Sequence, residues 1–292
     1  MVDHCSRWLF MLAALFAIAL FICIVFALAI KSTAILSRFS LLELLFTAPW
    51  DPERQLFGFF PAIVGTIYVT VLSMAFAVPI SILSALYLAE YIRGKMQTVL
   101  TSLVDVLAAV PSVVFGLFGL IVVAPFVNNY LAPVFGMKTT GYGILTASLV
   151  LSIMVFPIII SLTVESINSL PDELRESALA LGDTHWGLTR SVLLRAAGPG
   201  IISAVLLGFG RAFGETIAVA MVIGGTNIIP ASIFSSGQTL PSLLVNTFGE
   251  MMSLPLTQSA LIFVALILLI VVTAFNILAA VTRQNFERKW RY

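Results

Sequence analysis

The sequence is poor in charged residues, in histidine and in cysteine. Lys, Arg, Asp and Glu together make up 10% of its 292 residues, whereas about 25% is usual in soluble domains. With 60% hydrophobic residues beside that low charge, the chain is not an ordinary soluble domain, so a domain count from its length does not apply. Its net charge of +1 gives no reason to expect a nucleic-acid partner.

Residues that would carry metal or catalytic chemistry are also scarce. Cys5 and Cys23 fall at or within the first apolar run and match neither a disulfide framework nor a metal site. His4 and His185 lie outside the apolar runs, and Asp105 is the one aspartate inside a run, close to its end. These residues do not make the site of an intramembrane enzyme. No GxxxxGK[ST] pattern occurs, so ATP hydrolysis is not expected here, nor is a cofactor or metal in this chain.

The chain is rich in apolar runs of the length that crosses a bilayer, about 20 residues. The first run is about 23 residues, longer than the core of a secretory signal, so we expect it to remain as an uncleaved helix. The sequence predicts an all-α membrane protein with six transmembrane helices, near 8–30, 61–89, 104–127, 143–164, 200–222 and 258–282.

Prolines interrupt three of these runs. Pro79, Pro111 and Pro157 lie inside or at the edge of a predicted span. Neighbouring helices can satisfy the backbone groups that a proline frees, so the pattern favours kinked helices. A broken helix that lines a pathway is the alternative.

The positions of Lys and Arg predict the orientation. With a cytoplasmic N-terminus, ten of the fifteen fall in inner segments and four in outer ones, and the remaining one is Arg211. This bias favours both termini inside, although Lys31 and Arg38 oppose it. We therefore expect a multi-pass protein of the cell (inner or plasma) membrane. Of the outer segments, 240–252 is amphipathic and is expected to lie at the interface or to re-enter partway.

The inner connection at 165–198 is predicted to fold as a helix–turn–helix. Residues 169–173 combine Ser, Pro and two acids, which is a helix-start signal. Strong helix formers follow until Gly182, and a second apolar-periodic helix precedes Pro199. An ordinary loop is the alternative, but it leaves the length and pattern of this segment unexplained.

A motif within this connection resembles the EAA signature of ABC importer permeases. It comprises an acid with two small residues, a glycine, and an aliphatic pair: Glu176, Ser177, Ala178, Gly182, Val192 and Leu194. Small residues would let a short helix seat against a partner, and the glycine permits a turn. We interpret Glu176, Ser177, Ala178 and Gly182 as ATPase-coupling residues. Arg195 replaces the proline that usually ends the signature, which leaves the angle of the second helix open.

Longer segments resemble the phosphate-specific transport permeases. They include "VPSVVFGLFGL", "GFGRAFGETIAVAMVIGG" and "QTLPSLLVNTFGE", and the tail of the second is closer to the PstC-type than to the PstA-type subunit. The resemblance implies a type I ABC importer permease with the MetI-like fold. It divides the chain into an N-terminal helix with its outer connection (1–60) and a five-helix permease domain (61–292).

The same resemblance implies partners and a substrate. A PstA-type permease would complete a heterodimer, a cytoplasmic ATPase dimer would bind ATP and Mg, and an external phosphate-binding protein would deliver phosphate. Two alternatives remain open from the sequence. One is a permease for another oxyanion, such as sulfate or molybdate, and the other is an ion-coupled secondary carrier.

Two charges fall inside the fifth predicted span, Arg211 and Glu215. Each costs roughly 2.5–3.5 kcal/mol near a helix centre. Four residues apart on one helix, they would share a face and reach each other. They either form a stabilising pair or face a hydrated pathway, where a guanidinium suits a tetrahedral oxyanion. The matching residues of PstC-like permeases are taken to lie on the translocation route, which implies the pathway role. Gly210 and Gly214 would let a neighbouring helix approach.

Overall fold

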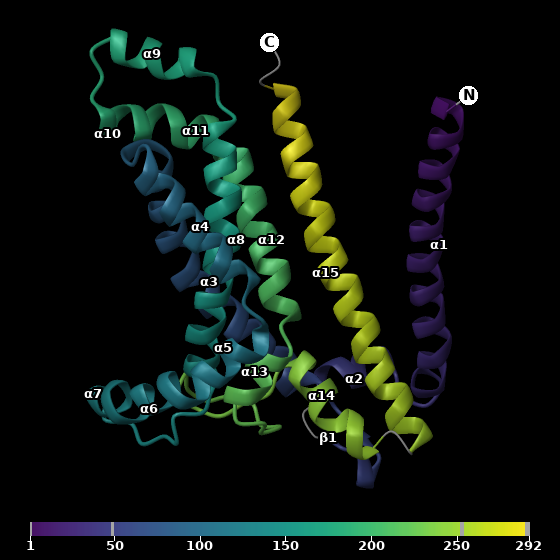
Figure 1. The fold of residues 1–292 in the computed structure, drawn as a ribbon. Coiled ribbons are helices and arrows are strands. Elements are labelled where there is room, and N and C mark those ends of the chain that lie inside the picture. The colour runs from purple at the N-terminus through teal and green to yellow at the C-terminus, as the bar shows by residue number, and fades with distance from the viewer. Residues whose placement is uncertain (1, 48–49, 252–253, 290–292) are drawn as a thin grey trace.

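The computed structural model describes residues 2–47, 50–251 and 254–289, and these are almost entirely helical (Figure 1). The N-terminal region begins with α1 (Val2–Leu36) and α2 (Leu41–Phe46). A short hairpin follows, in which β1 (Trp50–Asp51) pairs antiparallel with β2 (Leu56–Phe57) around the turn η1 (Pro52–Arg54). The predicted all-α fold is confirmed, with this hairpin as its small exception.

The centre of the molecule is a bundle of long apolar helices. It consists of α3 (Phe60–Leu86), α8 (Ile144–Asn168), α12 (Gly198–Gly214) and α15 (Pro255–Lys289). α3 packs along α8, and α12 packs on both α8 and α15. The main core cluster joins α3 and α8 to residues 115–132, to Ala212 of α12 and to residues 218–234. Helices that are apolar on every face can bury several faces at once. α3 and α8 run through Pro79 and Pro157 without ending.

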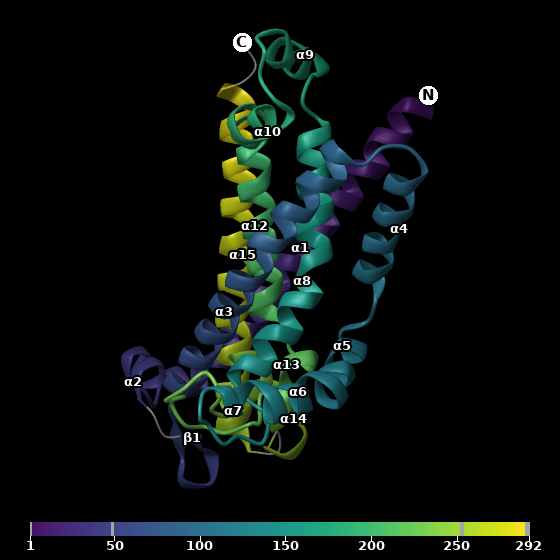
Figure 2. The same ribbon diagram turned by 90° about the vertical axis from the view of Figure 1, so that its left-hand side faces the viewer.

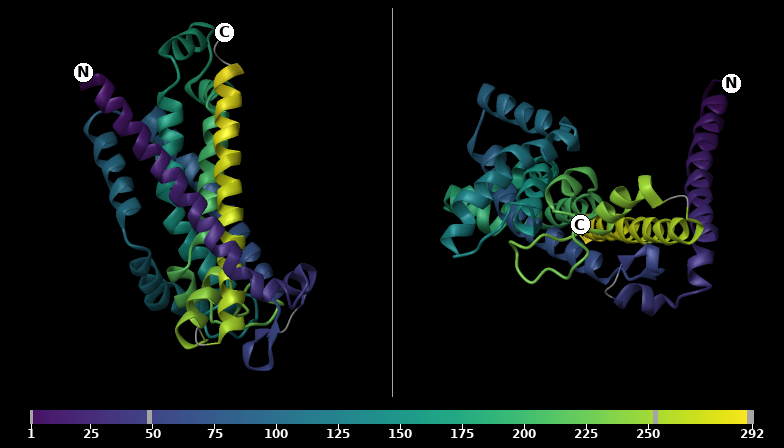
Figure 3. Two further views of the ribbon diagram at one scale, coloured as in Figure 1. Left: turned by 90° about the vertical axis from the view of Figure 1, so that its right-hand side faces the viewer. Right: turned by 90° about the horizontal axis from the view of Figure 1, so that it is seen from below.

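α1 is attached to the bundle at one end. None of its most apolar stretch is buried, and the helix diverges from α15 toward the N-terminus (Figures 1 and 3). Two hydrogen bonds contribute to the attachment: the Ile35 amide donates to Ser259 Oγ at 3.0 Å, and Ser259 Oγ donates to the Lys31 carbonyl at 2.7 Å. A second core cluster around Phe59 packs this end of α1 against α2, α14 (Leu240–Met251) and α15.

The third predicted span, 104–127, is wrong as a continuous helix. α3 ends in the π-helical turn η2 (Tyr87–Tyr91), and α4 (Lys95–Ala109) then stops at Val110, whose backbone is extended before Pro111. The proline ring disfavours the helical region for the residue before it, and here the helix ends there. Figure 2 shows α4 separated from the following helical segment by this break. That segment comprises α5 (Ser112–Phe118), η3 (Gly119–Val123), α6 (Ala124–Phe126), η4 (Val127–Leu131) and α7 (Ala132–Val134).

The fifth predicted span, 200–222, is also broken. α12 ends at Gly214, Glu215 is extended, and a separate helix α13 (Ile217–Val222) follows. In the described residues, five helices are long and apolar enough to span a membrane, or six if the pair 185–196 and 198–214 counts as one bent span. The prediction of six spans agrees with the larger number, with changed boundaries.

The two ends of the bundle differ in character. One end carries α9 (Asp172–Ala180), α10 (His185–Gly187), η5 (Leu188–Leu193) and α11 (Leu194–Ala196), together with the chain-terminal ends of α1 and α15 (Figure 1). The opposite end carries the hairpin, α13 and α14 (Leu240–Met251). The predicted amphipathic segment 240–252 is therefore helical over its described part.

Candidate functional site

The segment between α8 and α12 folds as the predicted helix–turn–helix. Gly182 has a φ of +83°, a conformation that costs glycine little and other residues more. The turn is closed by two backbone bonds, from Gly182 N to the Leu179 carbonyl and from Asp183 N to the Ala178 carbonyl. Thr184 then caps the second helix by accepting from Gly187 N at 3.0 Å. Gly182 thus has the turn-forming role that the sequence predicts.

The small residues of the motif act differently from the expectation. Ala178 is buried against Leu188 and Leu193, so it holds the two short helices to each other. Glu176 and Ser177 are exposed and remain available to a partner. Of the small pair, one residue therefore packs inside the element and only the other lies at its surface.

The turn exposes three large apolar side chains that sequence reasoning missed. The exposed fractions are 39% for Leu179, 89% for Leu181 and 56% for Trp186. An apolar cluster on a segment outside the spans is typical of a protein–protein contact. The sequence does not reveal this exposure, because Leu181 and Trp186 could equally well have been buried between the two short helices.

The connection to α12 bends sharply without the usual proline. The helix of residues 185–196 and α12 meet at 67°. Arg195 is exposed within α11, and Ala197 lies at the corner. Pro199, in the first turn of α12, has no amide hydrogen to leave unsatisfied there. The angle between the second helix and α12, which the sequence did not predict, is thus set at Ala197 and Pro199.

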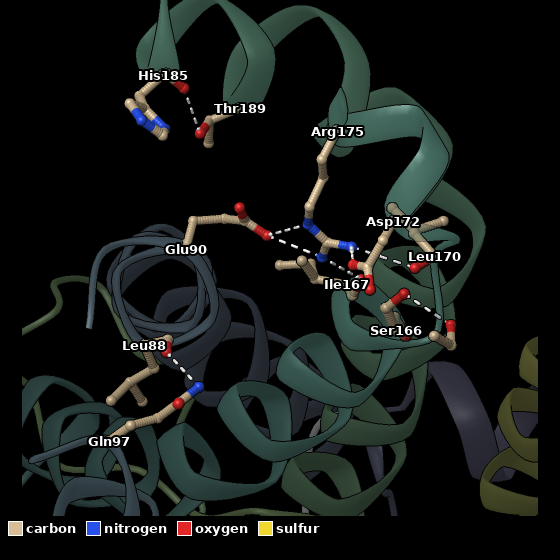
Figure 4. Close-up of polar contacts among 11 residues, drawn as sticks. Leu88, Glu90, Gln97, Ser166, Ile167, Leu170, Asp172, Arg175, His185 and Thr189 are labelled. Atoms are coloured by element: carbon tan, nitrogen blue, oxygen red, sulfur yellow. Dashed lines mark hydrogen bonds and ion pairs between the residues drawn. The ribbon is translucent and has the colours of Figure 1, made fainter. Parts of the chain in front are cut away.

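A hydrogen-bonded ion pair anchors α9 to the end of α3 (Figure 4). Arg175 donates to Glu90 Oε1 from Nε at 3.2 Å and from Nη2 at 3.0 Å. The same guanidinium bonds the carbonyls of Ile167 and Leu170 and the carboxylate of Asp172. Sequence reasoning missed this pair, because Glu90 and Arg175 are 85 residues apart and neither belongs to a recognisable motif.

Arg211 and Glu215 do not lie on one helical face. Arg211 is exposed in the last turn of α12, and the helix ends before Glu215. The Glu215 carboxylate instead accepts from Ala218 N at 3.3 Å, at the start of α13. Arg211 makes no ion pair or hydrogen bond with the described residues. The prediction that the two residues share a helical face is therefore wrong, and the stabilising pair, one of the two alternatives, does not form; Arg211 has no partner among the residues that the structure describes.

The predicted glycine contact exists but is loose. A Cβ at Gly210 would lie 3.6 Å from Phe275 Cβ, and one at Gly214 would lie 3.6 Å from Val272 Cγ2, both ordinary contacts with α15. The tighter approach is to α8, where a Cβ at Gly208 would lie 2.9 Å from Ile159 Cγ1. Gly210 and Gly214 thus face a neighbouring helix as predicted, but the closest packing of α12 is on another face.

The described residues contain no group of three or more His, Cys, Asp or Glu side chains placed to hold a metal ion. Apolar helices of membrane-spanning length, with a helix–turn–helix beyond one end of the bundle, are the features of a multi-pass membrane protein.

Comparison with known proteins places the chain in a family. Residues 77–292 match the family of binding-protein-dependent transport system inner membrane components, and the chain belongs to that family. It is 34% identical to the probable ABC transporter permease protein YqgH of Bacillus subtilis, over 94% of this chain and 88% of that protein. It is also 34% identical to the phosphate transport system permease protein PstC of Haemophilus influenzae, over 91% of this chain and 89% of that protein.

Solved structures agree on the fold. The structure of the inward-facing MetNI methionine ABC transporter matches with a TM-score of 0.61 and 19% identity, covering 82% of this chain and 99% of that one. A bacterial alginate ABC transporter in complex with an alginate-bound periplasmic protein matches with a TM-score of 0.60 and 17% identity, covering 99% and 96%. At such identities the likeness extends to the MetI-like permease fold and no further.

Proposed function

We propose that this chain is the PstC-type permease subunit of an ABC importer for inorganic phosphate. The proposal rests on the helix–turn–helix of residues 172–196, which lies outside the spans and is called the docking element from here on. The substrate comes from the relatives, since the protein of Haemophilus influenzae is named as a phosphate transport system permease. A relative of the same name occurs in Xylella fastidiosa, with 33% identity over 84% of this chain.

The energy source in this proposal is a cytoplasmic ATPase dimer that binds ATP and Mg. The apolar cluster of Leu179, Leu181 and Trp186 supplies the contact, and Glu176 and Ser177 lie on the same helix–turn–helix. Because the sequence lacks a P-loop, nucleotide binding falls to the partner. A PstA-type permease and an external phosphate-binding protein complete the assembly.

The orientation follows from the position of the docking element. α9–α11 and the termini lie at one end of the bundle (Figure 1), and the Lys and Arg bias assigns that end to the cytoplasm. The loop after α13, α14 and the hairpin then face the external binding protein. Both termini are cytoplasmic in this arrangement.

Arg211 and Glu215 are proposed to lie on the route of phosphate. Arg211 has an exposed guanidinium without a partner among the described residues, and such a fork binds a tetrahedral oxyanion through paired hydrogen bonds. Glu215 follows it at the break between α12 and α13. A carboxylate close to the bound anion would weaken its hold and favour release.

The test is an ATPase assay on the reconstituted complex. ATP hydrolysis is measured in proteoliposomes with the external binding protein and phosphate, sulfate or molybdate. We expect phosphate, but neither sulfate nor molybdate, to stimulate ATP hydrolysis. Stimulation by sulfate or molybdate instead would assign another oxyanion, and uptake driven by an ion gradient without any ATPase would overturn the proposal.

A further inference from the structure

Arg175 occupies the junction of three helices. Its guanidinium meets the carbonyls of Ile167 at 3.1 Å and Leu170 at 3.2 Å, just where α8 ends. It also meets the Asp172 carboxylate at 3.1 Å, where α9 begins, and Glu90 at the end of α3 (Figure 4). The Arg175 side chain thus donates hydrogen bonds to carbonyl groups at the end of a spanning helix and also holds the start of the docking element.

The two carboxylates that it contacts differ in their surroundings. The Glu90 side chain is 12% exposed and that of Arg175 is 20% exposed, whereas Asp172 is 86% exposed. A charge-assisted hydrogen bond is stronger where water is excluded. The bond to Glu90 is therefore the firm one, and the bond to Asp172 is screened by solvent.

The ion pair joins the docking element to α3, whereas the bond to the Ile167 carbonyl joins it to the end of α8. Among the residues that the structure describes, it is the one ion pair between α9 and a spanning helix. α9 otherwise packs on η5, which belongs to the docking element itself. A displacement of α9 therefore reaches α3 through Arg175 and Glu90.

The end of α3 is in turn joined to α4. Glu90 lies in the π-helical turn η2, and the Leu88 carbonyl of the same turn accepts a hydrogen bond from Gln97 Nε2 at 3.1 Å (Figure 4). The body of α3 packs along α8. Movement of η2 is thus passed on to α4 and α8 together.

We propose that the Glu90–Arg175 pair is the coupling link that carries movement of the docking element into α3. This inference rests on the proposed function, since it requires an ATPase that moves α9. Glu90 and Arg175 are positioning residues in it, and neither contacts the substrate. Breaking the link should leave the ATPase bound and hydrolysing but separate hydrolysis from transport.

The main test replaces Glu90 alone. In Glu90→Met, Arg175 keeps Ile167, Leu170 and Asp172 as partners, so its charge is not left unpaired and the complex should assemble. We expect uptake per ATP hydrolysed to fall about tenfold, the factor that loss of a charge-assisted hydrogen bond represents. Glu90→Gln keeps an acceptor of the same size and should give a smaller fall. Asp172→Asn, which alters only the exposed partner of the same guanidinium, is the comparison variant and should lower the ratio less than Glu90→Met does.

The readouts separate coupling from stability. Uptake and hydrolysis are normalised to assembled complex, and the melting temperature is measured beside them. An unchanged ratio of uptake to hydrolysis in both Glu90 variants would overturn the proposal, even with a lowered melting temperature. The ratio is taken with whichever oxyanion the wild-type complex carries. Failure of the wild-type complex to bind an ATPase would contradict the proposed function instead.

Discussion

Arg211 and Glu215 are each accommodated by a helix end. A cation is favoured in the last turn of a helix and an anion in the first, because the peptide dipoles align along the axis. Arg211 lies in the last turn of α12, and Glu215 precedes α13 and accepts from its Ala218 amide. The break at Glu215 therefore lowers the cost of two charges that a continuous span would carry unaided.

The first prediction concerns Arg211. Arg211→Leu should leave a permease of normal abundance that binds its ATPase but transports no phosphate, because no ion pair with a described residue is lost. Arg211→Lys should also impair uptake, since a point charge lacks the paired donors of a guanidinium. Phosphate uptake into proteoliposomes measures both variants. Normal uptake by Arg211→Leu would remove Arg211 from the pathway.

The second prediction concerns Glu215. In a dry, mutually neutralised pair, loss of the carboxylate would cost about 3–5 kcal/mol. Here Glu215→Gln should cost about 1 kcal/mol or less, because an amide oxygen can still accept from Ala218 N. Thermal unfolding of the purified complex checks this expectation. Loss of the folded protein in Glu215→Gln would show that the carboxylate is paired with a cation after all.

At the scale of elements, close approach depends on particular glycines. The third prediction compares Gly65 on α3 with Gly210 on α12. A Cβ at Gly65 would lie 2.1 Å from the Gln238 carbonyl oxygen, and backbone cannot move aside cheaply. Gly65→Ala should therefore destabilise by about 1–3 kcal/mol. Gly210→Ala has room and should be neutral or stabilising by up to about 1 kcal/mol.

These two variants are a matched pair, because each adds one methyl group to a helix of the bundle. Melting in detergent, followed by tryptophan fluorescence, measures the difference. Equal melting temperatures for Gly65→Ala and Gly210→Ala would contradict the packing described for α3 against residue 238.

The fourth prediction concerns the turn of the docking element. Nothing lies within 4 Å of a Cβ added at Gly182, so the cost of substitution is conformational rather than steric. Asn tolerates a positive φ better than a β-branched residue does. Gly182→Val should weaken co-purification of the ATPase, and Gly182→Asn should largely preserve it. Equal recovery of the ATPase with both variants would exclude a conformational requirement at this turn.

At the scale of the molecule, the arrangement of the two ends gives a fifth prediction. Leu181 is 89% exposed at the end that bears the termini, and Ile233 is 43% exposed at the opposite end. With Cys5 and Cys23 replaced by Ser, an impermeant thiol reagent should label Ile233→Cys in intact cells. It should label Leu181→Cys only after the membrane is opened. The reverse pattern would invert the orientation.

The sequence by itself determined the class of this protein. Scarce charge and long apolar runs require a membrane, and the spacing of Glu176, Ser177, Ala178 and Gly182 locates the helix–turn–helix of residues 172–196. Both are local properties: hydropathy sums over about 20 residues, and a glycine turn depends on the backbone of a few. Because each span is such a local feature, the spans can be counted from the sequence. Their even number, and the two that follow residues 172–196, place both termini on the same side as that segment.

Only the tertiary structure decided where helices break and what they touch. The apolar run at 200–222 does not reveal that α12 ends at Gly214, because apolar residues continue across the break. The pair Glu90–Arg175 and the contact of Gly65 with Gln238 join segments far apart in the chain. Helical periodicity describes neighbours within a few turns, whereas such contacts depend on how whole helices pack. For that reason Ala178 could be assigned to the docking element from its spacing, but its partners Leu188 and Leu193 could not.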